Sequence, residues 1–234
     1  NSSGNEELES KKLNILDRAN FMAKQFRNAF IALRNQGWCP DLVISHSGWG
    51  CGIYVKEVWP YCKQISYLEW WFNPNSSFYT YDSENIDLGI SQSQIPKNWI
   101  RNQHVALELC LADVIVAPTD WQRAQLPASL KNRCKIIFDG IDTNEFIPKN
   151  QNFVKPRPVI TYGTRGMEPM RAFPQMIRSL PKVLQTFPNL TVEIAGDEKA
   201  YYGKGENQSG QTWKSWAIEF LSEKSLASRV KWLG

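Results

Sequence analysis

The sequence has little that suits a membrane-spanning or nucleic-acid-binding protein. Its longest apolar run is far short of the ~20 residues that a bilayer span needs, so it predicts no transmembrane segment. The formal charge is only +4, from 27 basic and 23 acidic residues, and no dense basic run is present. This balance argues against a nucleic-acid partner. Any positively charged site must therefore be local.

Cysteine is sparse and shows no metal-binding pattern. The five cysteines have no CxxC spacing, and their odd number without a signal peptide predicts reduced thiols, with neither a disulfide nor a zinc site. We therefore expect a cytoplasmic protein that needs no metal and no bound cofactor. Peripheral contact with the inner face of a membrane stays open.

Tryptophan, in contrast, is abundant. The chain has 10 tryptophans among 234 residues, and 42% of its residues are hydrophobic. This composition supports a sizeable core in one large or two smaller domains. The clustered tryptophans are explained either by core packing or by a groove for a sugar or a lipid.

Short apolar strands alternate with helical segments along the chain, which predicts α/β units with parallel sheets. A polar, proline-bearing stretch separates two such series. We therefore predict one Rossmann-like domain over 1–147, a linker over 148–157 and a second Rossmann-like domain over 158–234. The expected helices are at 13–36, 98–111, 121–126 and 173–186. The expected strands are at 42–45, 64–67, 113–117, 135–138, 159–162 and 191–195.

The segment Val159–Gln175, VITYGTRGMEPMRAFPQ, reads as a strand, a turn with two arginines, and the start of a helix. Arg165 and Arg171 would then stand beside free backbone N–H groups and the positive end of a helix, which together attract anions. The segment predicts a phosphate site. The alternative is that both arginines are solvated turn residues.

A second candidate site follows the predicted strand at 42–45. The loop His46-Ser47-Gly48-Trp49-Gly50 lies at the carboxyl end of that strand, where open α/β sheets bind ligands. His46 is its chemically useful member, although a lone histidine also often has a structural role.

Several motifs resemble family 4 glycosyltransferases. CKIIFDGIDTNEFIP is similar to their interdomain segment, and ITYGTRGMEPMRAFPQMIRSLPKVL resembles the opening of their donor-binding domain. PDLVISHSGWGCGIYVKEVWP, SYLEWWF and LADVIVAPTDWQRAQLP are similar to the N-terminal domain of a bacterial branch of that family.

The resemblance implies a GT-B fold, with two facing Rossmann-like domains, and a retaining, metal-independent transfer of a sugar. The donor would be a nucleotide-diphosphate sugar, and the acceptor a saccharide or a lipid-linked glycan, as in polysaccharide biosynthesis. The residues that it implies for the donor site are Gly163, Arg165, Arg171, Gly196 and Asp197. It places His46, Gly48, Trp49, Gly50 and Glu69 on the acceptor side, with His46, Arg165 and Arg171 as the catalytic residues.

The sequence also departs from the family pattern. The family's first strand and its carboxylate pair for the donor sugar have no counterpart, so we expect both domains to be incomplete and the chain alone to be inactive. Cys51 stands where an acidic residue is expected, and Arg171-Ala172 replaces the commoner Lys-Gly. Two alternatives are a non-catalytic nucleotide-sugar binding or accessory module, and a GT-B enzyme such as an epimerase or a phosphorylase.

Overall fold

The structure is a computed structural model of the 234-residue chain and describes residues 15–80, 88, 90–147, 158–203 and 205–234. The chain divides into two compact units. The first holds the described residues of Asn1–Phe78 and Ile90–Glu145, and the second those of Tyr79–Gly89 and Phe146–Gly234. The predicted linker, 148–157, and the predicted N-terminal loop, 1–11, lie outside the described residues.

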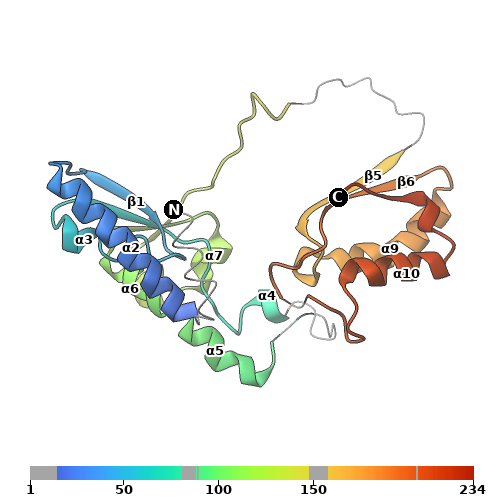
Figure 1. Ribbon diagram of the computed structural model, residues 1–234, viewed down its shortest axis with the longest axis horizontal. Coiled ribbons are helices and arrows are strands. Elements are labelled where there is room, and N and C mark those ends of the chain that lie inside the picture. Colours follow the sequence, from blue (N-terminus) through green and yellow to red (C-terminus); the bar gives the residue numbers. More distant parts are fainter. Residues whose placement is uncertain (1–14, 81–87, 89, 148–157, 204) are drawn as a thin grey trace. The chain divides into compact units, whose positions relative to one another are not determined.

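A four-stranded parallel sheet in the order β1-β2-β3-β4 forms the centre of the first unit. Helices α2, α3 and α6 contact one another or the sheet (Figure 1). The elements of this part of the chain are α2 (Ile15–Asn35), β1 (Leu42–His46), α3 (Val55–Val58), β2 (Lys63–Tyr67), α4 (Ser77–Thr80), η1 (Gln92–Gln94), α5 (Ile95–Ile100), α6 (Gln103–Leu111), β3 (Val114–Ala117), α7 (Asp120–Gln125), α8 (Ala128–Lys131) and β4 (Cys134–Ile136).

The second unit has a three-stranded parallel sheet in the order β5-β6-β7, with α9 and α10 packed side by side against it (Figure 1). Its elements are β5 (Val159–Gly166), η2 (Pro169–Arg171), α9 (Phe173–Thr186), β6 (Thr191–Asp197), α10 (Trp213–Glu223), η3 (Ala227–Arg229) and β7 (Val230–Trp232).

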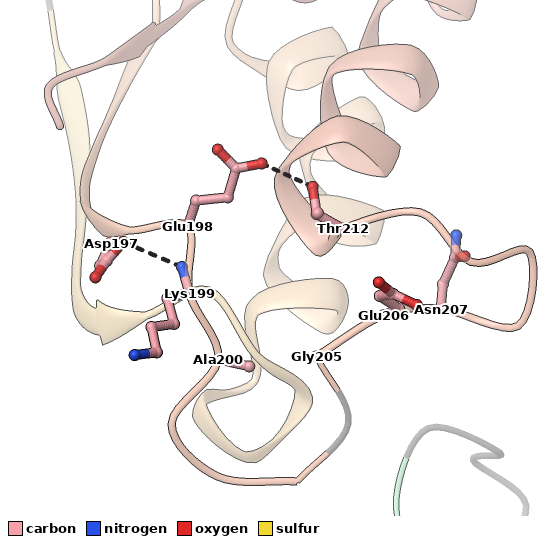
Figure 2. A pocket seen from close by; sticks show the side chains of 8 residues that line it. All are labelled: Asp197, Glu198, Lys199, Ala200, Gly205, Glu206, Asn207 and Thr212. Atoms are coloured by element: carbon pink, nitrogen blue, oxygen red, sulfur yellow. Dashed lines mark hydrogen bonds between the residues drawn. The ribbon is translucent and has the colours of Figure 1, made fainter. Parts of the chain in front are cut away.

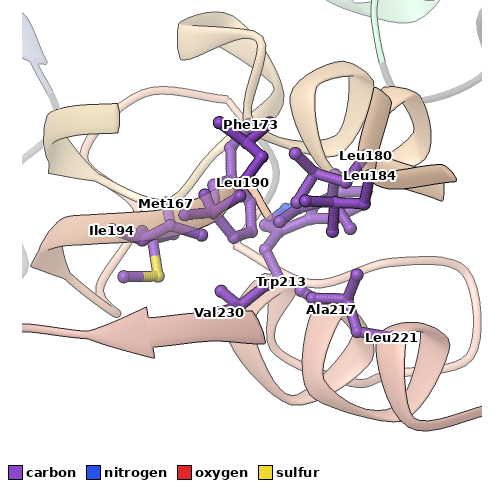
Figure 3. Close-up of a cluster of buried hydrophobic side chains, with 12 residues drawn as sticks. Met167, Phe173, Leu180, Leu184, Leu190, Ile194, Trp213, Ala217, Leu221 and Val230 are labelled. Carbon is purple, nitrogen blue, oxygen red and sulfur yellow. The ribbon is translucent and has the colours of Figure 1, made fainter. Parts of the chain in front are cut away.

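The core of the second unit follows from helical spacing. Four residues of α9 recur on one stripe and are at most 1% exposed, and three residues of α10 face them at spacings of four. Alternate residues of β6 complete the cluster from the sheet, because successive strand residues point to opposite faces (Figure 3). These residues are Phe173, Ile177, Leu180, Leu184, Trp213, Ala217, Leu221, Val192 and Ile194.

The helix predicted over 98–111 is instead two helices, α5 and α6, which are separated at Arg101 and Asn102. Asn102 is buried and its side-chain amide pairs with the backbone of Phe72, accepting from the N–H and donating to the carbonyl, both at 2.9 Å. That pairing of a helix residue with a distant backbone segment is a tertiary contact that local periodicity does not show.

Only some of the apolar residues of α6 are buried. Leu107 and Leu111 are 49% and 39% exposed, whereas Val105, Glu108 and Leu109 are buried. The buried set has helical spacing, while 105, 107, 109 and 111 alternate as a strand would. The buried position at 108 is thus taken by a carboxylate.

Strands β5 and β6 run further than predicted. β5 extends to Gly166 and β6 to Asp197, so Gly163, Arg165, Gly196 and Asp197 lie in strands rather than in turns. Three steps along β5 from Gly163 to Gly166 match two steps along β6, which marks a β-bulge. Because a bulge adds a residue to one strand, pairing between β5 and β6 resumes at Gly166, beyond the predicted end of the strand.

Candidate functional site

His46 is the last residue of β1 and lies beside Tyr67 at the end of the parallel strand β2. Its Nδ1 accepts from the backbone N–H of Gly48 at 3.3 Å, and its Nε2 lies 3.0 Å from the Glu69 carboxylate. Because a backbone N–H only donates, Nδ1 is the unprotonated nitrogen. Nε2 then carries the proton and donates a hydrogen bond to Glu69. The structure therefore brings together His46, Gly48 and Glu69, three residues that the sequence singled out.

The glycines of the following loop have separate packing roles. Gly50 has φ +73°, and a Cβ there would lie 2.8 Å from the carbonyl oxygen of Ala19 on α2. A Cβ on Gly48 would meet only ordinary contacts, with the His46 ring at 3.4 Å. Trp49 between them is 60% exposed. Gly50 thus lets the loop approach α2, and Trp49 stays at the surface.

Glu108 of α6 lies beneath this loop and is fully buried. Its Oε1 accepts from the hydroxyls of Ser45 at 2.6 Å and Ser66 at 3.3 Å. Burial raises the pKa of this carboxyl, and the hydrogen bonds from Ser45, Gly52 and Ser66 offset part of that rise. A buried carboxyl therefore ties the ends of β1 and β2 to the loop after His46.

Two further groups of this unit were not predicted as site residues. His104 Nε2 lies 3.2 Å from the carbonyl oxygen of Gly48, and burial lowers the pKa of the ring. Tyr67 donates to Asp139 at 2.9 Å, and its burial and this bond raise the pKa of Tyr67 to about 12. Neutral His104 and Tyr67 add polar groups on two sides of the loop and strand end.

Cys51, which replaces the expected acidic residue, is not a reactive thiol. Its Sγ–H donates to the carbonyl oxygen of His46 at 3.1 Å, and burial raises the pKa of the thiol to about 11. The nucleophilic form of cysteine is the thiolate, which is scarce at neutral pH when the pKa is that high. Cys51 therefore acts as a small hydrogen-bond donor that fixes the His46 carbonyl.

In the second unit, Arg165 lies in the β-bulge of β5 and is exposed. Its guanidinium carbon is 4.1 Å from the centre of the Tyr201 ring and 5.8 Å from that of Tyr202. Arg171 reaches the same Tyr202 ring at 5.6 Å. The two predicted arginines thus share one tyrosine as a neighbour.

Glu168 is the buried acid of this region, at 1% exposure. Its Oε2 accepts from the backbone N–H groups of Tyr201 and Tyr202, and its Oε1 lies 3.7 Å from Arg171 Nε. The backbone N–H of Phe173, the first residue of α9, donates to the Glu168 carbonyl at 3.3 Å. With Pro174 next in the helix, the first two positions of α9 offer no free N–H to an anion.

Gly196 and Asp197 occupy the end of β6. A Cβ on Gly196, which has φ +146°, would lie 2.2 Å from the carbonyl oxygen of Thr164, so β5 and β6 approach closely there. Asp197 accepts from the backbone N–H of Lys199 and from the Tyr201 hydroxyl, and these two bonds lower the pKa of Asp197. Gly163, the remaining predicted donor residue, has open space where a Cβ would be.

An open hollow of about 810 Å³ begins at Asp197. Its lining includes Asp197, Glu198 and Glu206 with Lys199, and it does not include Arg165 or Arg171 (Figure 2). Glu198 accepts from Thr212 at 2.8 Å across the hollow (Figure 2). Among the described residues that line it, acidic side chains outnumber the one cation, which disfavours a phosphate there, and the two arginines lie outside it.

The comparisons with known proteins give the family. A profile of the glycosyl transferase family 4 group matches residues 3–146, which is more than half of the chain. The chain belongs to this family. No match was found among the curated proteins.

Solved structures similar to this family 4 chain have low sequence identity. The crystal structure of TarM matches 88% of this chain and 35% of its own, with 12% identity and a TM-score of 0.53. The catalytic domain of starch synthase IV from Arabidopsis thaliana, bound to ADP and acarbose, matches 95% of this chain and 53% of its own, with 12% identity and a TM-score of 0.54. The chain thus spans between a third and just over half of these proteins.

This likeness confirms the predicted fold class, α/β with Rossmann-like parallel sheets of the GT-B type. In the described part of this family 4 chain, no helix is long and apolar enough to cross a bilayer. Among the same residues, no three His, Cys, Asp or Glu side chains are grouped as metal ligands would be. The site residues, the domain roles and metal independence stay predictions.

Proposed function

We propose that this family 4 chain carries parts of the acceptor and donor domains of a retaining glycosyltransferase of the hexosyltransferase class. The enzyme moves a sugar from a nucleotide-diphosphate sugar to a saccharide or lipid-linked acceptor, without a metal, in polysaccharide biosynthesis. We place it in the cytoplasm, with contact at the inner face of the membrane. That the starch synthase of similar fold is bound to ADP and acarbose supports a nucleotide and a saccharide as ligand classes.

The observation that carries this proposal is the state of Arg165. Arg165 is exposed, its guanidinium carbon lies 4.1 Å from the centre of the Tyr201 ring, and no carboxylate among the described residues pairs with it within 4.0 Å. Arg171 and Lys199 lie within 6 Å of the same pair of tyrosine rings. These three cations outnumber the two carboxylates beside the rings, Asp197 and Glu168, and the net positive charge suits a diphosphate.

The chemistry of such a transfer is mainly electrostatic. The nucleoside diphosphate leaves with growing negative charge, so fixed cations at its phosphates stabilise the transition state more than the ground state. In the proposed roles, the diphosphate is bound by Arg165 and Arg171, and the nucleotide lies near Gly163, Gly196 and Asp197. The reacting sugar contacts His46, and the acceptor side is lined by Gly48, Trp49, Gly50 and Glu69.

Glu69 has a defined role within this proposal. Its carboxylate accepts a hydrogen bond from His46 Nε2–H, while the Gly48 N–H donates to Nδ1. A ring fixed at both nitrogens keeps one tautomer and one orientation. Glu69 therefore orients His46 toward the sugar rather than reacting with it.

The proposal is tested by nucleotide release from a panel of UDP-, ADP- and GDP-sugars, in the full-length protein that carries this sequence. Arg165→Ala should lower kcat by ~100-fold or more, as the loss of other preorganised charge partners does. Arg178→Ala is the matched control, because Arg178 also stacks on an aromatic ring, Trp216 at 5.0 Å, but lies on α9 away from the predicted donor residues.

Unchanged turnover in Arg165→Ala would contradict the role of Arg165. Tight binding of a nucleoside diphosphate without release from any donor would instead favour the non-catalytic binding module. Equal losses in Arg165→Ala and Arg178→Ala would point to a general effect on the fold.

A further inference from the structure

Two consecutive tyrosines, Tyr201 and Tyr202, organise the cations of the second unit. The Tyr201 ring has Arg165 at 4.1 Å and Lys199 at 5.7 Å, and the Tyr202 ring has Arg165 at 5.8 Å and Arg171 at 5.6 Å. Both tyrosines are partly exposed, at 38% and 51%. Their rings therefore do not serve the core: cations lie over both of them, and the Tyr201 hydroxyl bonds to Asp197.

Stacking of this kind orients an arginine without using up its hydrogen bonds. The guanidinium group is planar, and its five N–H donors lie in that plane. A ring beneath the face of the group attracts the cation through the ring quadrupole, while the donors at its edge stay available to phosphate oxygens. Tyr201 can thus hold Arg165 while donors at the edge of the guanidinium stay available to an anion.

Tyr201 itself is held at two points. Its hydroxyl donates to Asp197 Oδ2 at 2.9 Å, and its backbone N–H donates to Glu168 Oε2, which also accepts from the N–H of Tyr202 at 2.7 Å. Glu168 is almost fully buried, so these bonds are shielded from water. Both ends of Tyr201 are therefore anchored, one by an exposed and one by a buried carboxylate.

The path of the chain past β5 adds a steric constraint. A Cβ on Gly166 would lie 2.5 Å from the carbonyl oxygen of Lys199 and 2.8 Å from the Tyr201 ring. The segment that carries Tyr201 consequently packs directly on the end of β5, next to Arg165. Thr164 closes the bulge locally, since its hydroxyl donates to the Gly166 carbonyl at 2.9 Å.

We propose that Tyr201 and Glu168 are positioning residues for Arg165: the guanidinium is held over the Tyr201 ring, and Glu168 holds the backbone of Tyr201. The identity of the anion, a nucleoside diphosphate, rests on the proposed function. The positioning itself rests only on the contacts around Arg165.

The first experiment needs no ligand. The Arg165 Nε–H signal, assigned by its loss in Arg165→Lys, is followed by NMR in the 234-residue chain at mildly acidic pH. Ring currents of Tyr201 should shift it in the wild type and in Tyr201→Phe, which keeps the ring. In Tyr201→Leu the signal should move to the position of a free arginine. The Arg178 signal, over Trp216, should stay constant in all variants.

Glu168 is tested with a second pair of variants. Glu168→Gln keeps a carbonyl oxygen that can accept from both backbone N–H groups, so the Arg165 signal should stay near its wild-type position. Glu168→Leu removes the acceptor, and the signal should shift toward that of Tyr201→Leu. If Glu168→Leu does not fold, the Tyr201 pair still decides the matter, because Tyr201 is at the surface.

The second experiment measures binding of UDP, ADP and GDP by calorimetry in the full-length protein. Tyr201→Leu should weaken the best of them about two- to fivefold, the effect of one exposed cation–π contact, while Tyr201→Phe should leave it unchanged. Turnover with the matching donor should fall in kcat more than KM rises, since a misdirected cation acts mainly on the transition state.

The outcomes separate the two proposals. If the Arg165 signal responds to Tyr201→Leu but no nucleoside diphosphate binds, the positioning holds and the proposed donor is wrong. If the signal is the same in Tyr201→Leu and in the wild type, the positioning role is overturned whatever the binding data show.

Discussion

Each unit keeps one glutamate almost fully buried beneath its candidate site, and the two glutamates are paired in different ways. Glu108 accepts from the hydroxyls of Ser45 and Ser66, whereas Glu168 accepts from the backbone N–H groups of Tyr201 and Tyr202. In each case one carboxylate oxygen has no hydrogen-bond partner among the described residues.

The difference lies in what the partners can do. A serine hydroxyl rotates and can donate or accept, so the two serine bonds of Glu108 persist in either protonation state, and only its bond from the Gly52 N–H needs an acceptor oxygen. A backbone N–H only donates and is fixed in direction, so the loop at Tyr201 needs an acceptor oxygen at that place. The first unit thus tolerates a neutral buried acid, while the second requires an acceptor to hold its loop.

The largest expected effect on stability comes from a substitution beside Glu108 in the first unit. A Cβ on Gly52 would lie 2.3 Å from both Glu108 Oε1 and Ser45 Oγ, which are buried and cannot withdraw easily. Gly52→Ala should therefore lower the free energy of unfolding by about 3 kcal/mol, at the upper end of overpacking costs. Hydrogen exchange of the β1 and β2 amides measures this in the first unit alone.

Gly48→Ala is the control for that prediction, because its Cβ would make only ordinary contacts at 3.4 Å. We expect it to change the same free energy by no more than ~0.5 kcal/mol. Equal effects of the two substitutions would show that Gly52 is not pressed against Glu108.

An intermediate effect is expected from Glu108→Gln, and it depends on pH. Burial raises the pKa of Glu108 in the folded state, so the unfolded chain releases this proton first, near the ordinary glutamate value of about 4.3. Folded molecules then hold more protons than unfolded ones, and stability falls as pH rises from that value through the folded pKa. Glu108→Gln, which keeps the serine bonds, should lack this fall.

Urea unfolding across a pH series measures the difference between the wild type and Glu108→Gln. The stability gained by the variant should grow as pH rises. Glu145→Gln, which removes an exposed carboxylate, is the control for the loss of one negative charge. If Glu108→Gln runs parallel to the wild type, the Glu108 carboxyl has the same pKa in both states.

The smallest effect concerns the loop beside Glu168. Ala172 has φ 56° and ψ 25°, the left-handed region that costs a residue with a Cβ about 1–2 kcal/mol. Glycine removes that cost but loses more backbone entropy on folding, so Ala172→Gly should stabilise the second unit by only about 0.5–1 kcal/mol. Hydrogen exchange of the β6 amides reports this change.

Ala227→Gly is the matched control, since Ala227 is exposed in η3 and has no positive φ. It should destabilise the unit by up to ~1 kcal/mol. A loss of stability in Ala172→Gly as well would mean that the left-handed conformation carries no strain there.

Much of the fold could be predicted from local pattern. The apolar stripe of α9 and the parallel strands that end at His46 and Tyr67 follow from periodicity and from strand–helix alternation. The site residues that were predicted lie at or near strand ends, as that alternation implies. One helix start is also encoded locally, because Thr119, directly before α7, accepts from the Gln122 N–H.

The residues that hold the sites could not be predicted in the same way. Glu108 stands between apolar residues in ALELCL, which is a faint signal of a buried acid, but its serine partners are 42 and 63 residues away. Glu168 and Tyr201 are 33 residues apart. Such pairs are set by how strands and helices pack, and no local spacing encodes them.

The sequence by itself determined the parallel α/β elements, the His46 loop and the two arginines, because periodicity, glycine and charge act over a few residues. Only the tertiary structure decided that Arg165 lies in a bulge over Tyr201 and that Glu69 accepts a hydrogen bond from His46 Nε2. It also decided that a buried glutamate lies beneath each candidate site. These arrangements depend on backbone segments that are distant in the sequence and meet only when the sheets form. Burial then shields the hydrogen bonds of the two glutamates from water and strengthens them.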